Sequence, residues 1–200
     1  MSLTFSLGPC PVKVGFSWLA LLTFCCLFGG EAGSAFSLLA MLLHEAGHLG
    51  VMVLLGSPPR RVELTALGCD LVLDAARPLP PAHQALVSLA GPAGNLLCWG
   101  CCALLGLREH PFAWVSLALG LFHLLPAEPL DGGLAIRAVC TPWLGPARAR
   151  RVSRVLTVAT VLPLGALGFL VLLRTRYNFT LLALAVYLML YLVLREDRFL

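Results

Sequence analysis

Charged side chains are scarce in this chain of 200 residues. Asp, Glu, Lys and Arg together make up 12% of it, whereas hydrophobic residues make up 59%. In an ordinary soluble domain the charged fraction is about a quarter. The composition therefore excludes an ordinary soluble globular domain and predicts an α-helical polytopic membrane protein.

Two signatures of other membrane proteins are also absent from the sequence. No Gly-x-Ser-x-Gly or Gly-x-Ser-Gly motif occurs, which disfavours serine intramembrane proteolysis. No inverted repeat is visible, which lowers the case for a transporter. Most of the eight cysteines lie in apolar segments, where cysteine acts as a small apolar side chain, so we predict no disulfide framework.

Long apolar segments are what the chain does contain. About 20 apolar residues cross the ~30 Å hydrocarbon layer of a bilayer as a helix. We predict six spans, the fourth of them short, at residues 14–30, 36–56, 85–107, 112–126, 155–173 and 177–194. The whole chain is interpreted as a single transmembrane domain, with its core motifs at 36–133 and accessory helices at 14–30, 155–173 and 177–194.

The positive charges fall between these spans. When the 14 Lys and Arg residues are sorted by alternate loops, all lie on one side except Arg108, Arg174 and Arg176. Cytoplasmic loops carry the excess of positive charge, so we expect both termini to be cytoplasmic. This distribution explains the net charge of +4 without a nucleic-acid partner. The arginines of 148–154 are expected in a cytoplasmic loop before the fifth span.

A short β-hairpin is predicted between the second and third spans. Polar and apolar residues alternate over Val62–Ala66, a turn is expected at Gly68–Asp70, and Leu71–Leu73 would form the second strand. The open edge of such a hairpin could receive an extended peptide, although a hairpin that only caps the bundle is an equally weighted alternative.

The motif HEAGH at residues 44–48 lies inside the second apolar segment. On a helix, His44 and His48 share one face and can bind one metal ion, while Glu45 lies about 100° around the axis. This arrangement is typical of a zinc hydrolase in which the glutamate is the general base. Three fixed positions occur by chance in about one per cent of chains of this length, so the surroundings of the motif matter.

A catalytic zinc usually has three protein ligands, so a further ligand must come from elsewhere in the chain. The fourth span ends in PAEPLDGG, where both Glu128 and Asp131 are chemically able to bind a metal. The third span carries Gly91-Pro92-Ala93-Gly94-Asn95, whose glycines permit close helix packing. Asn95 is predicted either to hydrogen-bond between helices or to orient a group in the site.

These three ordered motifs resemble those of the site-2 intramembrane zinc metalloproteases, particularly the compact branch that includes the stage IV sporulation protease. In that family the aspartate of the PLDGG-like motif is the third zinc ligand, which carries over to Asp131 and ranks Glu128 below it. The family usually has asparagine eight residues earlier, whereas this chain has His123. We expect His123 to contact substrate or support the metal site, with metal ligation and simple packing as alternatives.

The predicted function is therefore that of an intramembrane zinc metalloendopeptidase, with Zn²⁺ held by His44, His48 and Asp131 and with Glu45 as the catalytic base. The resemblance implies a substrate that is a membrane-embedded or membrane-tethered regulatory protein, such as a pro-transcription factor. Two alternatives stay open: an inactive homologue that binds membrane clients, and a metal or ion transporter, because intramembrane His, Glu and Asp also line ion pathways.

Overall fold

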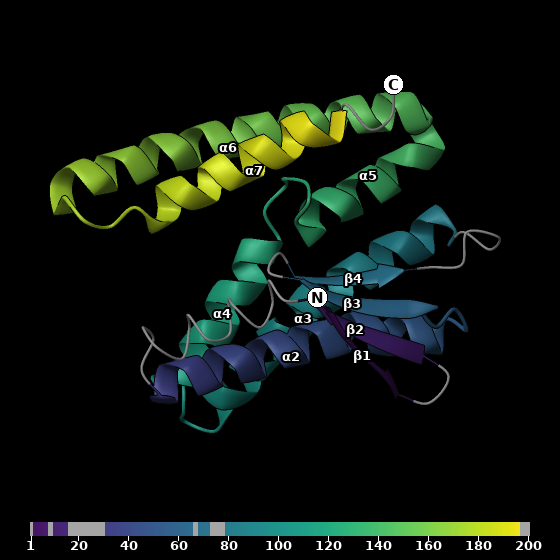
Figure 1. Ribbon diagram of the computed structural model, residues 1–200, viewed down its shortest axis with the longest axis horizontal. Coiled ribbons are helices and arrows are strands. Elements are labelled where there is room, and N and C mark those ends of the chain that lie inside the picture. The colour runs from purple at the N-terminus through teal and green to yellow at the C-terminus, as the bar shows by residue number, and fades with distance from the viewer. Residues whose placement is uncertain (1, 8–9, 16–30, 66–67, 73–78, 197–200) are drawn as a thin grey trace. The chain divides into compact units, whose positions relative to one another are not determined.

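The structure is a computed structural model that describes residues 2–7, 10–15, 31–65, 68–72 and 79–196. The chain divides into two compact units (Figure 1). The first comprises Met1–His83 and Ala90–Leu121, and the second comprises Gln84–Leu89 and Phe122–Leu200.

A four-stranded sheet belongs to the first unit. Its strands are β1 (Ser2–Leu7), β2 (Cys10–Gly15), β3 (Arg61–Thr65) and β4 (Gly68–Val72), and they lie in the order β1-β2-β3-β4. Strands β1 and β2 are antiparallel, β2 and β3 are parallel, and β3 and β4 are antiparallel. The parallel pair places Lys13 opposite Glu63, with Nζ 3.9 Å from Oε1. Two segments far apart in the sequence are thus joined in one sheet.

The sheet differs from the isolated hairpin that the sequence predicts. Gly68, Cys69 and Asp70 were expected in a turn, but they form most of strand β4 and pair with Thr65, Leu64 and Glu63. The first predicted span is also wrong at its start, because Val14 is a buried residue of strand β2. Residues 16–30 of that span lie outside the described residues.

Three helices accompany the sheet in this part of the chain: α2 (Glu31–Leu54), α3 (Pro81–Leu104) and α4 (Pro111–His123). Helices α2 and α3 approach each other closely at Gly47, where an added Cβ atom would lie 2.6 Å from the backbone oxygen of Ala90. Only glycine allows this separation of the two backbones, and the HEAGH motif therefore faces α3 directly.

The second unit contains α5 (Asp131–Leu144), α6 (Pro146–Thr175) and α7 (Thr180–Glu196). Helices α6 and α7 lie side by side along most of their length (Figure 1). A buried cluster joins them to the segment before α5, and its members are Ala127, Leu130, Val161, Ala185 and Leu188. The segment that carries PLDGG is thereby fixed against two long apolar helices.

Helix α5 begins at Asp131 itself and lies outside the six predicted spans. One expectation about this unit needs correction. The arginines of 148–154 were expected in a loop, but they lie in the first turns of α6, because Pro146 is well suited to the first turn of a helix.

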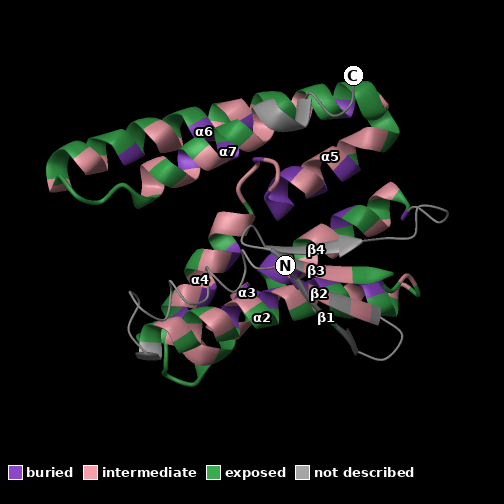
Figure 2. Cartoon of the chain, viewed as in Figure 1, coloured by how far each residue is buried: buried purple, intermediate pink, exposed green. Residues whose placement is uncertain are grey.

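Among the described residues, three helices are long and apolar enough to cross a membrane: Gly33–Leu54, Pro81–Leu104 and Pro146–Thr175. Pro111–His123 and Thr180–Leu192 are shorter apolar helices. Exposed residues recur along α6, as Figure 2 shows in green. Large apolar residues are among them, for example Leu162, Phe169 and Leu170. Such a surface is expected of a protein that contacts lipid. The count of six spans stays a prediction.

The close contact of α6 and α7 generates a test with a matched control. A Cβ atom at Gly168 would lie 2.6 Å from the backbone nitrogen of Leu182, whereas one at Gly165 would lie 3.6 Å from Cβ of Ala185. We expect Gly168→Ala to lower the free energy of unfolding by about 1–3 kcal/mol, because a backbone must move to accommodate the methyl group. Gly165→Ala should have no destabilising effect, since alanine favours the helix by up to about 1 kcal/mol.

Thermal unfolding of the two variants in detergent measures the difference. Equal melting temperatures for Gly168→Ala and Gly165→Ala would contradict the close packing of α6 against α7.

Candidate metal centre

Buried polar side chains are few among the described residues, and four of the seven were singled out from the sequence: His44, His48, Asn95 and Asp131. The other three are Ser116, Ser153 and Thr157. Burying a polar group in an apolar environment is costly unless it is paired. The coincidence with the HEAGH, GPAGN and PLDGG motifs therefore indicates a functional reason for their burial.

Helix α2 brings the two histidines of HEAGH together in the first unit. His44 and His48 are 2% and 7% exposed, and their Nε2 atoms lie 3.2 Å apart. The rings meet edge to face, with centroids 4.8 Å apart and planes at 80°. Glu45, on the same helix, is half-buried. One turn of helix thus aims both Nε2 atoms at the same point.

The spacing of these nitrogens fits a metal ion. Two nitrogens bound to a tetrahedral zinc at about 2.0–2.1 Å lie about 3.3 Å apart. Helix α3 leaves room for the rings because Gly91 has no side chain: a Cβ atom there would lie 2.8 Å from Nε2 of His44 and closer still to Nε2 of His48. The donor set, its spacing and this glycine all suit zinc.

Asn95 lies on α3 four residues after Gly91 and is fully buried. Its Nδ2 is 3.4 Å from Nδ1 of His44, and its Oδ1 has no hydrogen-bond partner among the described residues. The first unit therefore brings together His44, His48 and Asn95.

The second unit brings together His123 and Asp131. Nδ1 of His123 lies 2.7 Å from Oδ2 of Asp131, and the Asp131 side chain is 12% exposed. An imidazole N–H that donates to a carboxylate leaves that nitrogen unable to bind a metal. The contact therefore fits a supporting role for His123 through Nδ1.

The two glycines after Asp131 allow the chain to fold back on itself. A Cβ atom at Gly132 would lie 2.6 Å from the backbone carbon of Leu124, and one at Gly133 would lie 2.6 Å from the backbone nitrogen of Glu128. The segment after α4 therefore packs directly on the first turn of α5. This packing fixes the backbone from which the Asp131 carboxylate projects.

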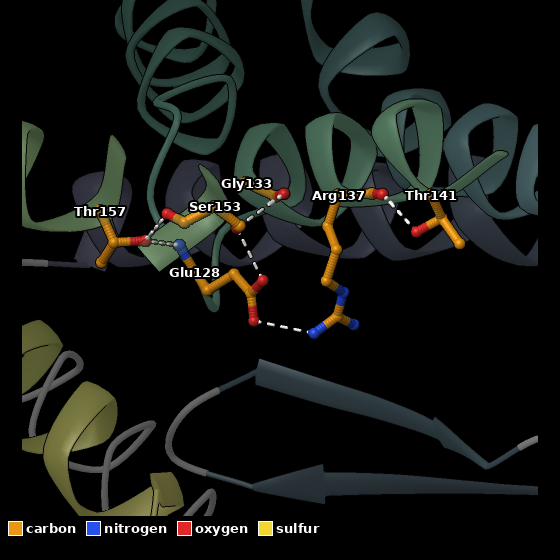
Figure 3. A network of polar contacts seen from close by, with 6 residues as sticks. All are labelled: Glu128, Gly133, Arg137, Thr141, Ser153 and Thr157. Atoms are coloured by element: carbon orange, nitrogen blue, oxygen red, sulfur yellow. Dashed lines mark hydrogen bonds and ion pairs between the residues drawn. The ribbon is translucent and has the colours of Figure 1, made fainter. Parts of the chain in front are cut away.

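Glu128, the other candidate ligand, is engaged in a separate network (Figure 3). Its Oε2 accepts a hydrogen bond from Nη1 of Arg137 at 3.0 Å, and its Oε1 accepts one from Oγ of Ser153 at 2.7 Å. Its backbone N–H donates to Oγ1 of Thr157 at 3.0 Å. Both carboxylate oxygens are thus used within the second unit, which favours Asp131 over Glu128 as a metal ligand.

Reasoning from the sequence missed Arg137, Ser153 and Thr157. Ser153 and Thr157 are four residues apart on α6, and the hydroxyl of Thr157 donates to the backbone oxygen of Ser153 at 2.9 Å. Two small hydroxyl residues at helical spacing near the start of the predicted fifth span were the available signal. They attach the PLDGG segment to α6.

Comparison with known proteins adds named relatives. The zinc metalloprotease Rip3 of Mycobacterium tuberculosis is 36% identical over 153 residues, which cover 65% of this chain and 38% of Rip3. A zinc metalloprotease of Methanocaldococcus jannaschii is 25% identical over 125 residues, covering 57% of this chain and 36% of that protein. The chain thus spans less than two fifths of the curated relatives it matches. No profile of a known protein family matches the chain.

A solved structure matches over almost the whole chain. The site-2 protease from Methanocaldococcus jannaschii has a TM-score of 0.64 and 18% identity, and the match covers 94% of this chain and 92% of that one. At this identity the likeness shows a shared fold. The predicted Zn²⁺ is supported by the relatives' names and by the histidine and carboxylate donors described above. The chain is thus similar in fold to a site-2 protease and similar in sequence to proteins named zinc metalloproteases.

Proposed function

We propose that this chain is an intramembrane zinc metalloendopeptidase whose metal ligands are His44, His48 and Asp131. The observation that carries the proposal is the 3.2 Å separation of the two Nε2 atoms on α2, which suits two ligands of one tetrahedral zinc. Asp131 would supply the third ligand, as the resemblance to the site-2 proteases implies. The names of the relatives agree with this chemistry.

Each residue of the proposed site has one task. When bound, zinc lowers the pKa of a coordinated water and polarises the scissile carbonyl. Glu45 would accept the proton of the attacking water and deliver it to the leaving amine. The contact of His123 with Asp131 would hold the carboxylate in place, as hydrogen bonds to metal ligands commonly do.

The setting of the site supports a proposal for the substrate class. The HEAGH motif lies within a helix that is long and apolar enough to cross a membrane. We propose a multi-pass membrane enzyme with cytoplasmic termini that cleaves a membrane-embedded or membrane-tethered regulatory protein. A transmembrane helix hides its peptide bonds, so the substrate must unwind locally before cleavage. The edge of strand β4 could bind the extended segment.

One departure from the family pattern favours a second candidate function. His123 stands where the family usually has an asparagine implicated in holding the substrate backbone, and its Nδ1 contacts Asp131. A homologue with an altered substrate site could bind membrane proteins without cleaving them. A test for cleavage therefore distinguishes a protease from such a binding protein.

The general base gives the decisive test. We expect Glu45→Gln to keep one zinc per chain and to lose cleavage by at least about 100-fold, because proton transfer by a positioned group contributes roughly 10²–10⁴-fold. Membranes from cells that express the wild type or Glu45→Gln would be compared by mass spectrometry for new peptide termini inside transmembrane segments. Equal numbers of such termini would contradict the protease and favour the client-binding homologue.

The two carboxylates of the PLDGG segment form a matched pair. We expect Asp131→Asn to reduce zinc binding severely, because it removes an anionic ligand. Glu128→Gln should keep zinc close to one per chain, since its oxygens contact Arg137 and Ser153. The zinc content of the purified proteins is measured by metal analysis. Loss of zinc in Glu128→Gln but not in Asp131→Asn would show that Glu128, and not Asp131, is the metal ligand.

His123 can be tested by keeping or removing its hydrogen bond. His123→Asn retains a donor for Oδ2 of Asp131 and should bind zinc within a few-fold of the wild type. His123→Leu removes the donor and should weaken zinc binding about 10-fold, the lower range for support of a metal ligand. Equal zinc affinities for these two variants would contradict the supporting role.

A further inference from the structure

The side-chain amide of Asn95 is buried with one of its polar atoms lacking a hydrogen-bond partner among the described residues. The side chain is fully buried on α3, and its Oδ1 has no hydrogen-bond partner among the residues that the structure describes. Its Nδ2 instead lies 3.4 Å from Nδ1 of His44, which is 2% exposed. A buried amide oxygen that loses its water and gains no donor destabilises the protein, so a hydrogen-bond donor for Oδ1 is expected.

A histidine that binds a metal through Nε2 has an N–H at Nδ1 that can be this donor. A neutral imidazole that binds a metal through Nε2 carries its proton on Nδ1, and that N–H must find an acceptor. The Nδ2 group of Asn95 is itself a donor and cannot accept it. A half-turn about the Cβ–Cγ bond exchanges the amide oxygen and nitrogen, which places Oδ1 opposite Nδ1 of His44.

The surrounding backbone leaves little freedom for either side chain. Gly91 and Asn95 lie four residues apart, on one face of α3, and an added Cβ at Gly91 would overlap both imidazoles of HEAGH. Gly47 holds α2 against the backbone of Ala90. The ring of His44 is therefore enclosed between Gly91, which leaves space for its Nε2, and Asn95, which contacts its Nδ1.

We propose that Asn95 is a positioning residue of the metal centre. Its Oδ1 accepts the hydrogen bond of the Nδ1–H of His44 and so keeps Nε2 aimed beside Nε2 of His48. Because Asn95 is fully buried, its side chain is not exposed to a substrate, and this favours the positioning role over substrate binding. The inference rests on the proposed function, because it assumes that His44 binds zinc.

Zinc affinity, measured by competition with a chromophoric chelator on the full chain in detergent, tests the inference without any substrate. Asn95→Leu has a similar size and no acceptor, and it should weaken zinc binding 10- to 100-fold, as loss of such a hydrogen bond typically does. Asn95→Asp keeps an acceptor at the same place and should bind zinc within a few-fold of the wild type. Ser116→Ala is the control: Ser116 is also fully buried and its Oγ also lacks a partner among the described residues.

Two further measurements separate positioning from folding. The metal-free melting temperatures should be similar for Asn95→Leu and Ser116→Ala. The visible absorption of the Co²⁺-loaded protein should shift in Asn95→Leu and stay unchanged in Asn95→Asp and Ser116→Ala, because the spectrum reports the geometry of the ligands. If Asn95→Leu does not fold, Asn95→Ala takes its place, because alanine also removes the acceptor and should weaken zinc binding by the same 10- to 100-fold.

The outcomes distinguish the inference from the function on which it rests. A wild type that binds no zinc overturns the proposed function. If the wild type binds zinc, two results overturn the role of Asn95 and leave the proposed function standing. The first is that Asn95→Leu binds zinc as well as the wild type does. The second is that Asn95→Asp loses zinc although its metal-free melting temperature is unchanged.

Discussion

Burial of polar groups in an apolar chain is the constraint on which the rest of this structure depends. Each such group loses its hydration and must find a partner within the protein. In the first unit the two imidazoles of HEAGH face each other and the Asn95 amide. In the second unit His123 and Asp131 are paired, and Glu128 has its own partners. The buried polar groups are therefore concentrated in a few clusters, and two of these clusters contain the candidate metal ligands.

Glycine residues allow the backbones around these polar clusters to pack closely. Gly47 and Gly91 let α2 and α3 approach until the histidines of one helix touch the backbone of the other. Gly132 and Gly133 do the same for the segment that leads into α5. A side chain at any of these positions would push apart the backbones that carry the candidate ligands. The glycines of the three motifs are thus as necessary to this packing as the candidate ligands are to the proposed metal site.

Local patterns predicted much of this arrangement, and pairings distant in sequence account for what they missed. The helical spacing of His44 and His48 was sufficient to place both on one face of α2. Strand β1 was not predicted, although polar and apolar residues alternate strictly over Ser2–Leu7. The parallel pairing of β2 with β3 joins residues about fifty positions apart. The hairpin turn was misplaced because strand pairing extends to Gly68 opposite Thr65. The bonds that hold Glu128 to Ser153 and Arg137 likewise depend on the packing of α5 and α6.

The sequence by itself determined the membrane character, the positions of the motifs that carry the candidate ligands and the chemistry of their donor atoms. These properties follow from composition and from helical periodicity, which act over a few residues. Only the tertiary structure decided which carboxylate is engaged elsewhere, which nitrogen of His123 meets Asp131, and that Asn95 lies against His44. Such contacts join residues on different helices, and their geometry is set by how closely the backbones pack.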